Sequence, residues 1–236
     1  MRLNGICEPL QSAYKEGHST KTALVRVHND ICMAMDSQQV TLLVLLDLSA
    51  AFDTVDHKIL LNRLEHCVGI KGAALTWCAS YLSGRFQSVR VKDSVSHPSR
   101  LTCGVPQGSV LGPLLFTIYT LPLGGVIMPH GLRYKFYADD SELYVAFRPV
   151  YTELCVAISK TCDCIRDVNT WMTENFLQLN CDKTEITIIG TKQMLSRLPR
   201  DIKMSICGSD IAPKQLVRNL GLMFDCNLGF SEHITK

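Results

Sequence analysis

The sequence has almost no excess charge of either sign, because 24 Lys and Arg face 22 Asp and Glu in 236 residues, for a formal charge of +2. This balance excludes a strongly basic chain but not local basic patches. Residues 71–100 and residues 183–218 each carry a surplus of +4, which leaves −6 for the rest of the chain. A basic periphery around an acidic remainder suits a phosphate-bearing polymer lying across a metal site, and scattered solvated charge is the alternative.

Closely spaced cysteine pairs are also missing. The 11 cysteines are an odd number, and apart from Cys162 and Cys164 they are widely separated, with no C-x-x-C pair. This spacing argues against a zinc site and against a disulfide framework, and it predicts reduced thiols. The N-terminus lacks an apolar signal region, so we expect an intracellular protein, cytoplasmic or nuclear, that is not secreted.

Long uncharged stretches are rare, and residues 110–129 form the main one. Three glycines and three prolines interrupt it, which fits a buried helix followed by a turn better than a membrane span. We therefore expect no membrane partner. The hydrophobic content of 47% is enough to build the core of one globular domain.

The spacing of apolar residues predicts an α+β fold. Residues 40–46, "VTLLVLL", read as a strand covered on both faces, and this strand ends at Asp47. Asp56 can cap the helix that follows it. Helical spacing recurs in residues 74–82, 113–121 and 154–171; strands are predicted at residues 86–91 and 184–189, and hairpins at residues 134–147 and 204–224. We expect a partly antiparallel sheet with helices on one face.

The segment "KFYADDSEL" places Asp139 and Asp140 at the tip of the first hairpin. Asp is a good turn former, so this segment alone favours a simple loop. If the hairpin neighbours the strand that ends at Asp47, three carboxylates converge and repel one another unless cations lie between them. Oxygen ligands without His or Cys favour Mg²⁺, and two such ions can support phosphoryl transfer.

Six segments resemble, in order, the reverse-transcriptase domain of non-LTR (LINE-type) retrotransposons: "QSAYKEGHST", "LLVLLDLSAAFDTVDH", "GVPQGSVLGPLLF", "FYADDSELY", "LQLNCDKTEI" and "VRNLGLMFD". The resemblance implies a palm-type antiparallel polymerase sheet packed on helices. It also implies RNA-directed DNA synthesis by two-metal nucleotidyl transfer onto a primer 3′-OH. The implied cofactor is two Mg²⁺ ions, with Mn²⁺ as a substitute, and the implied partners are an RNA template, a DNA primer and deoxynucleoside triphosphates. No stable protein partner follows from it.

The resemblance assigns catalytic roles to four residues. Asp47 and Asp139 match the metal ligands, and Asp140 matches the third acid of the site. Lys183 matches the lysine proposed as general acid to the pyrophosphate leaving group. A lysine before a strand is otherwise usually a solvated end, so Lys183 has this simpler interpretation as well.

Further residues match substrate contacts. Phe52 matches the aromatic residue beneath the incoming sugar, where an ordinary core Phe is the alternative. Gln107 and Gly108 match the loop that contacts the nucleotide, where turn formation is the alternative. The residues that match template or primer contacts are Arg85, Asn219, Leu220 and Gly221.

The resemblance predicts one domain fragment with residues 1–39 as partial fingers, residues 40–190 as the palm core with inserted fingers elements, and residues 191–236 as a primer-grip-like hairpin and the end of the palm. The remaining fingers and the thumb of the family pattern are expected to be absent, so we expect little synthesis by this chain alone. A truncated, catalytically inactive remnant with weak nucleic-acid binding is the main alternative. A two-metal nuclease is a third, but it has no need for Phe52 or the "PQG" loop.

Overall fold

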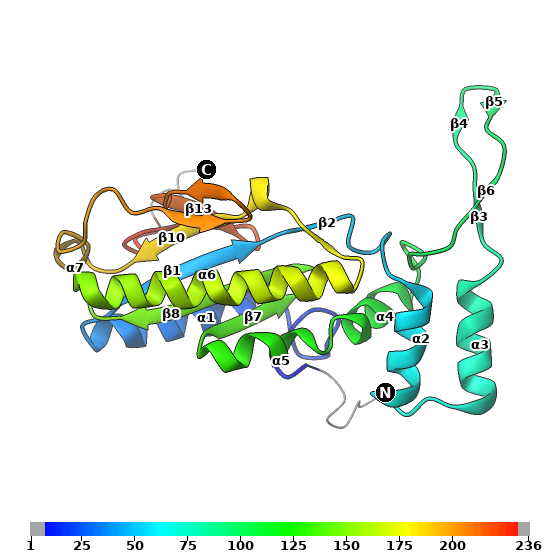
Figure 1. Ribbon diagram of the computed structural model, residues 1–236, viewed down its shortest axis with the longest axis horizontal. Helices are drawn as coiled ribbons and strands as arrows, with labels where there is room; N and C mark the ends of the chain where they lie inside the picture. Colours follow the sequence, from blue (N-terminus) through cyan, green and yellow to red (C-terminus); the bar gives the residue numbers. More distant parts are fainter. Residues whose placement is uncertain (1–7, 231–236) are drawn as a thin grey trace.

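The computed structural model describes residues 8–230 and is centred on a four-stranded antiparallel sheet (Figure 1). The strand order is β10-β1-β8-β7, with bounds Glu185–Ile189, Val40–Leu46, Asp140–Phe147 and Arg133–Tyr137. β1 is central and its residues are almost all buried, as its nearly unbroken apolar run predicted. The predicted hairpin is confirmed as β7 and β8, which pair from Arg133 opposite Tyr144 to Tyr137 opposite Asp140.

Each face of the sheet has its own covering layer. The long helix α6 (Tyr151–Glu174) covers one face, where Leu42 and Val44 join the larger core. On the other face, Leu43 packs with helix α1 (Thr20–Asp36) and with a hairpin formed by β13 (Leu216–Asn219) and β14 (Leu222–Asp225). The prediction of helices on one face is therefore wrong, because α1 and α6 cover opposite faces of a strand that is buried on both sides.

Helix α1 has no counterpart among the predicted elements, although its sequence carries a clear start signal. The Ser19 hydroxyl accepts a hydrogen bond from the Thr22 backbone N–H at 3.3 Å, and the Thr22 hydroxyl accepts from the Ser19 N–H at 2.8 Å. This reciprocal arrangement is a capping box. Buried residues then recur every three or four positions, and they are Ala23, Leu24, Val27, Ile31 and Ala34.

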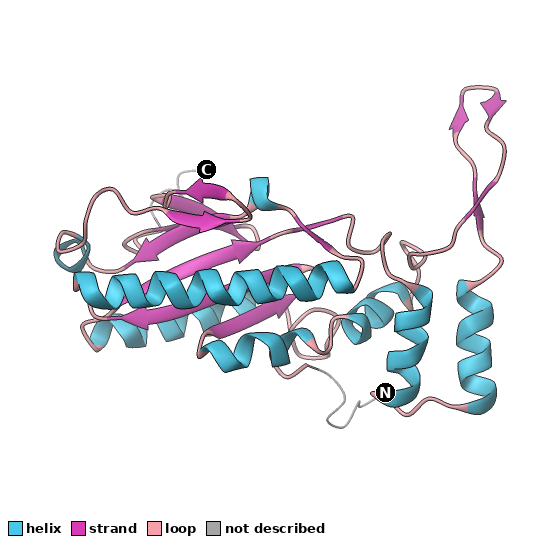
Figure 2. Cartoon of the chain, in the orientation of Figure 1, coloured by secondary structure: helices cyan, strands magenta, loops and turns pink. Residues whose placement is uncertain are grey.

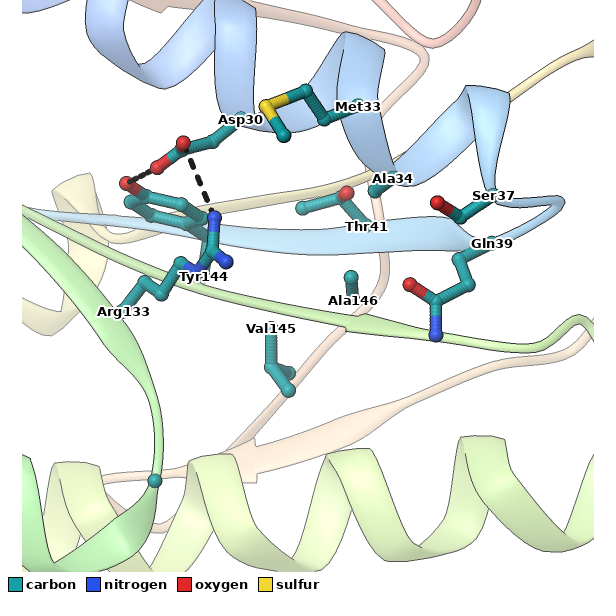
Figure 3. Close-up of a pocket in the computed structure, with 11 residues that line it drawn as sticks. Asp30, Met33, Ala34, Ser37, Gln39, Thr41, Arg133, Tyr144, Val145 and Ala146 are labelled. Atoms are coloured by element: carbon teal, nitrogen blue, oxygen red, sulfur yellow. Dashed lines mark hydrogen bonds and ion pairs between the residues drawn. The ribbon is translucent and has the colours of Figure 1, made fainter.

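The C-terminal half of α1 contacts the sheet through Asp30, as Figure 3 shows. Asp30 accepts a hydrogen bond from the Tyr144 hydroxyl at 2.7 Å and forms an ion pair with Arg133 at 3.1 Å. Burial, and then the hydrogen bond to Asp30, raise the pKa of Tyr144. A cavity of about 350 Å³ lies beside these groups, near Thr41 at the beginning of β1. It is therefore at the opposite end of β1 from Asp47.

Besides α6, which confirms the helix predicted at residues 154–171, three predicted helices are confirmed. They are α2 (His57–His66), α3 (Gly72–Leu82) and α4 (Gly112–Tyr119). Asp56 caps α2, since its Oδ1 accepts a hydrogen bond from the Ile59 N–H at 2.9 Å. Pro113 lies in the first turn of α4, where its missing N–H costs little.

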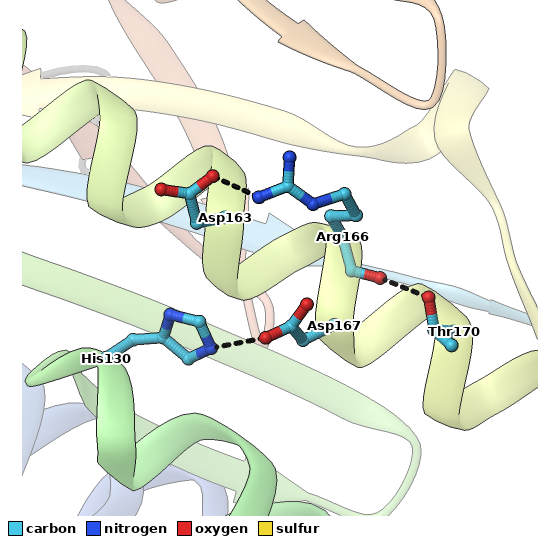
Figure 4. Close-up of polar contacts among 5 residues, drawn as sticks. All are labelled: His130, Asp163, Arg166, Asp167 and Thr170. Atoms are coloured by element: carbon cyan, nitrogen blue, oxygen red, sulfur yellow. Dashed lines mark hydrogen bonds and ion pairs between the residues drawn. The ribbon is translucent and has the colours of Figure 1, made fainter.

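The apolar segment that contains α4 is broken into short helices. α4 is followed by α5 (Leu123–Ile127) and by the 3₁₀ helix η1 (Met128–His130). By length and composition Gly112–His130 could cross a membrane, but about half of this segment is buried in the fold. Figure 4 shows how its end is fixed: His130 Nε2 lies 3.0 Å from Asp167 Oδ2 of α6. On α6 itself Asp163 pairs with Arg166, and the Thr170 hydroxyl donates to the Arg166 carbonyl at 3.0 Å.

A two-stranded ribbon projects from the end of α3 (Figure 2). One arm of the ribbon contains β3 (Phe86–Gln87) and β4 (Arg90–Val91), and the returning arm contains β5 (Ser94–Val95) and β6 (Ser99–Arg100). All four short strands are exposed. The prediction of one continuous strand over residues 86–91 is wrong, because the ladder is interrupted at residues 88–89 and resumes as a separate pair.

The C-terminal strands form two hairpins where one was predicted. β11 (Met204–Ile206) pairs with β12 (Ser209–Ile211), and β13 pairs with β14. The remaining short elements lie elsewhere in the chain. β2 (Leu48–Ser49) pairs with β9 (Gln178–Leu179), and β9 is followed by the 3₁₀ helix η2 (Cys181–Lys183) and, after β10, by α7 (Lys192–Leu195).

One pair of cysteines contradicts the prediction that all thiols are reduced. Cys181 of η2 and Cys207 of the β11–β12 turn form a disulfide, with their Cα atoms 6.4 Å apart. The eight other cysteines within residues 8–230 are free, so a disulfide framework is still excluded for that part. The bond ties η2, which carries Lys183, to the β11–β12 hairpin.

Candidate active site

The sheet brings two of the predicted acids to one edge. Asp47 directly follows β1, and Asp140 is the first residue of β8. The two strands pair with Leu46 opposite Ser141, so the next positions along the ladder are Asp47 and Asp140. Side chains opposite each other on antiparallel strands point to the same face, and these two therefore do.

Asp139 lies in the two-residue turn between β7 and β8, as predicted. Ala138 precedes it with a φ of 56°, a left-handed conformation that such a tight turn requires. The Gln11 side chain holds this turn from both sides: Nε2 donates to the Ala138 carbonyl at 3.1 Å, and Oε1 accepts from the Ala138 N–H at 3.0 Å. Sequence reasoning missed Gln11, although it lies in the quoted segment "QSAYKEGHST".

A cavity of about 360 Å³ opens beside the acids. Its polar lining consists of Asp47, Asp140, Asp182, Lys183, Glu185 and Arg218. The Lys183 ammonium lies 3.3 Å from Asp47 Oδ2, so the predicted lysine does face the predicted metal ligand. Asp182, Glu185 and Arg218 were not predicted, and their one signal in the sequence is their nearness to Lys183 and to the residue 219–221 turn.

The negative charges beside this cavity lie close enough to affect one another. Partial burial, followed by the negative charges of Asp139 and Asp47, raises the pKa of Asp140 to about 6, even though its side chain keeps contact with solvent. Asp47 Oδ2 is buried, and apart from the Lys183 ion pair it has no hydrogen-bond partner. Both effects are those that a bound cation relieves.

These oxygens fit a divalent cation as part of its ligand set. Within residues 8–230 no three His, Cys, Asp or Glu side chains are already gathered as a metal-binding cluster. Mg²⁺, however, is commonly held by one or two carboxylates together with water and substrate phosphates. Asp47 and Asp140, with Asp139 in the adjoining turn, supply such a partial set.

Glu142 lies one step deeper on the same face of β8 and is also an unpredicted member of the site. Its side chain is 2% exposed, and neither carboxylate oxygen has a hydrogen-bond partner. Burial raises the pKa of Glu142 to about 7; Asn219 and Lys135 lower it, and Asp140 raises it further. The Asn219 side chain is therefore close, although its Nδ2 also lacks a partner.

The predicted primer-contacting residues form the turn of the β13–β14 hairpin. Asn219 ends β13 and is buried, whereas Leu220 is half-buried and Gly221 is exposed. Leu220 and Gly221 have φ values of 45° and 89°, which the tight turn requires. Of the three residues, Asn219 faces the sheet, and Gly221 is the one open to solvent.

The predicted nucleotide-contacting residues form a second group, built on the turn after β2. Phe52 is half-buried and stacks on Phe116 of α4, with ring centroids 4.7 Å apart. The loop before α4 docks on the same turn, since the Val105 N–H donates to the Phe52 carbonyl at 2.9 Å. Gln107 lies on this loop and is exposed, as is Gly108.

Arg85 also belongs to this second group. Its guanidinium donates to the Gly104 carbonyl at 3.0 Å, and His57 Nε2 lies 2.8 Å from the same oxygen. The structure thus gathers Phe52, Gln107 and Arg85 around one loop. It places Asp47, Asp140 and Lys183 in a separate cavity.

Comparison with known proteins places this arrangement in a family. Residues 2–224 match the family described as "Reverse transcriptase (RNA-dependent DNA polymerase)". The chain is 29% identical over 231 residues to the "Probable RNA-directed DNA polymerase from transposon BS" of Drosophila melanogaster, covering 95% of this chain and 24% of that protein. It is 26% identical to the "RNA-directed DNA polymerase from mobile element jockey" of the same fly, covering 96% and 24%. The chain thus spans about a quarter of the length of these relatives.

Solved structures show a similar fold. A telomerase from Candida albicans, determined with a TWJ fragment of telomeric RNA, superposes with a TM-score of 0.59 at 13% identity, covering 93% of this chain and 34% of that one. An apo telomerase from Candida tropicalis gives a TM-score of 0.58 at 12% identity, covering 94% and 36%. At this identity the likeness concerns the fold alone.

Proposed function

This chain belongs to the reverse transcriptase (RNA-dependent DNA polymerase) family, and we propose that it performs the RNA-templated DNA synthesis of a non-LTR retroelement. The observation that carries the proposal is the placement of Asp47 and Asp140 at adjacent strand ends, beside a cavity that also holds Lys183. The proposed partners are an RNA template, a DNA primer and deoxynucleoside triphosphates.

Asp47 and Asp139, with Asp140 as the third acid, are the proposed holders of two Mg²⁺ ions. Bound there, the ions supply charge stabilisation for the attacking and leaving oxygens of nucleotidyl transfer. Support comes from the buried, unsatisfied oxygen of Asp47 and from the raised pKa of Asp140. The carboxylates thus present negative charge where the primer 3′-hydroxyl must lose its proton.

Lys183 is the proposed source of a proton for the pyrophosphate leaving group. Its ammonium already lies in the acid cavity, 3.3 Å from Asp47. In the reaction the primer 3′-hydroxyl passes its proton to solvent, its oxygen forms a bond to the α-phosphorus, the bond to the bridging oxygen breaks, and pyrophosphate departs with the Lys183 proton. An ammonium can donate this proton and also neutralise the developing charge.

Substrate selection is assigned to the second group of residues. Phe52, braced by its stack on Phe116, limits the space beneath the sugar and disfavours a 2′-hydroxyl. Gln107 and Gly108 contact the incoming nucleotide, and Arg85 contacts the template. Leu220 and Gly221, with Asn219 beneath them, contact the primer.

The same proposal divides the chain by role. Residues 1–39 contribute to the fingers, residues 40–190 form the palm with inserted fingers elements, and residues 191–236 contain the primer-grip hairpin and the end of the palm. The proposal draws support from the antiparallel sheet at the centre of the second part and from the β13–β14 hairpin in the third.

Primer extension on an RNA template tests the function. Because little synthesis is expected from this chain alone, we expect weak Mg²⁺-dependent addition of a single templated deoxynucleotide, and its loss in Asp139→Asn. Asp163→Asn, which changes an exposed acid on the outer side of α6, is the matched control and should keep the activity. Addition that continues after chelation of the metal, or that survives Asp139→Asn, contradicts the proposal.

A further inference from the structure

The turn after β2 and the loop before α4 are joined by a continuous backbone contact. The Gly104 N–H donates to the Val55 carbonyl at 2.8 Å, and the Val105 N–H donates to the Phe52 carbonyl at 2.9 Å. Gly104 has a φ of 80°, and a Cβ at this position would lie 2.8 Å from the Asp53 carbonyl oxygen. Only glycine permits so close an approach, so the distance between the two segments is fixed at the backbone.

This contact sets the Gln107 side chain against the Asp53 carboxylate. Gln107 Nε2 lies 2.8 Å from Asp53 Oδ1 and 2.9 Å from Oδ2, which makes both carboxylate oxygens acceptors of one amide. No other side chain within residues 8–230 donates a hydrogen bond to this carboxylate. Sequence reasoning missed Asp53, because 54 residues separate it from Gln107.

The chemistry of the two groups determines the orientation of the amide. An ionised carboxylate can only accept hydrogen bonds, so the Gln107 NH₂ must face Asp53. The carbonyl oxygen Oε1 is then turned away from Asp53 and is available to another molecule. Without this contact, both ends of an exposed glutamine amide are equally free to face a ligand.

We infer that Asp53 is a positioning residue that fixes the Gln107 carbonyl as a hydrogen-bond acceptor for the incoming nucleotide. The inference rests on the proposed function, since it assigns the loop's ligand to the nucleotide. Because Gln107 then presents an acceptor, the group of the nucleotide that the loop recognises must be a hydrogen-bond donor. Phe52, the neighbour of Asp53 in the chain and the proposed sugar contact, is joined to the same loop by the Val105 N–H.

Kinetics of single-nucleotide addition test the inference with three variants. Asp53→Asn replaces the carboxylate by an amide, which can either donate or accept, so the orientation of the Gln107 amide is no longer fixed. KM for the deoxynucleotide should then rise about tenfold, as expected for one lost charge-assisted hydrogen bond. The value of kcat should stay within threefold of the wild-type value. Gln107→Glu should raise KM further, because two carboxylates would then face each other. The double variant Asp53→Asn/Gln107→Glu should return KM to within threefold of the wild-type value.

The recovery in the double variant is the decisive result. The new amide at position 53 donates to the new carboxylate at position 107, and an acceptor oxygen still faces the nucleotide. If Asp53 only supported the loop, its substitution would lower the melting temperature as well as raise KM. Because the Asp53 and Gln107 side chains are both exposed, we expect the melting temperature of all three variants to stay unchanged. Unchanged KM in Asp53→Asn, or a double variant worse than either single one, overturns the inference.

Equilibrium binding separates this inference from the proposed function. The Kd of a fluorescent deoxynucleotide, mant-dATP, should rise about tenfold in Asp53→Asn and recover in the double variant. If the wild-type chain adds no nucleotide but shows this binding pattern, the proposed function fails and the role of Asp53 stands. If nucleotide addition occurs and Kd is the same in all variants, the function stands and the role of Asp53 is wrong.

Discussion

The Lys183 ammonium lies 3.3 Å from Asp47 Oδ2 and is the sole partner of that buried oxygen within residues 8–230. Under the proposed function, the lysine and the divalent cation therefore compete for this oxygen. Because the Lys183 side chain is 67% exposed, solvent screens the pair and its contribution to stability is small. The proposed function therefore assigns this contact a role in metal binding and chemistry rather than in folding.

Lys183→Met should consequently change metal binding and catalysis in opposite directions. Loss of the competing ammonium should tighten Mn²⁺ binding by a few fold, whereas loss of the proton donor should slow nucleotide addition by about 10²-fold, the lower end of the range for general acids. Titration with Mn²⁺ and single-turnover addition measure the two effects. Lys160→Met, on the exposed side of α6, is the control. A Lys183 variant with unchanged addition would make this residue an ordinary strand-end lysine.

Glu142 should make the protein less stable as pH rises. Its pKa is raised to about 7 in the folded protein, whereas an unfolded Glu titrates near 4.5. Between these values the folded state holds a proton that the unfolded state has lost, so the free energy of unfolding falls from about pH 4.5 to about pH 7. Below that window both states are protonated and the effect disappears.

Glu142→Gln removes this titration and keeps the shape of the side chain. The variant should be more stable than the wild type at pH 8, by on the order of 2 kcal/mol, and equal to it at pH 4. Urea unfolding at the two pH values measures the difference. Glu174→Gln, at the exposed end of α6, should show no such dependence. If Glu142→Gln and the wild type were equally stable at pH 8, the prediction would be wrong. The Glu142 carboxylate would then be stabilised in the folded protein by hydrogen bonds or charges that offset its burial.

Gly104→Ala should destabilise the fold more than the same change at another left-handed glycine. At Gly104 the new Cβ meets the Asp53 carbonyl oxygen at 2.8 Å, whereas at Gly84, with a φ of 68°, nothing lies within 4 Å. The left-handed conformation alone costs about 1 kcal/mol, so Gly84→Ala should lose about that much and Gly104→Ala about 2–3 kcal/mol. Urea unfolding compares them, and equal losses would contradict the close backbone contact.

Phe52→Val should relax sugar selection. The smaller side chain opens space beneath the sugar, so the ratio of ribonucleotide to deoxynucleotide addition should rise by at least tenfold while deoxynucleotide addition is largely kept. The stack on Phe116 is lost as well, at a cost of about 1 kcal/mol in stability. Phe86→Val, on the exposed ribbon, is the matched control. An unchanged ratio in a folded Phe52 variant would leave Phe52 as a core residue only.

The features predictable from the sequence are those set by neighbouring residues. The apolar run before Asp47 gave the bounds of β1, the Asp56 cap gave the start of α2, and the turn at Asp139 gave the β7–β8 hairpin. In each case a short pattern determines the structure, because a strand's burial, a helix cap and a tight turn depend on a few adjacent positions.

Features that depend on distant contacts were not predictable. The spacing of apolar residues in α1 does not determine which face of the sheet the helix covers. Because α1 packs on the face opposite α6, the prediction of helices on one face only was wrong. The division of residues 204–225 into two hairpins depends on pairing between segments whose apolar runs are very short. Asp53 and Gln11 act through partners 54 and 127 residues away, which no local pattern reports.

Electron paramagnetic resonance of bound Mn²⁺ tests most directly the central claim, that the acids at the ends of β1 and β8 form a catalytic metal site. Titrated in the presence of a deoxynucleoside triphosphate, the wild-type chain should bind two Mn²⁺ ions. Asp47→Asn and Asp139→Asn should each lose this binding, while Asp163→Asn keeps it. Equal Mn²⁺ binding by wild type, Asp47→Asn and Asp139→Asn, in chains that melt at the same temperature, would contradict the account.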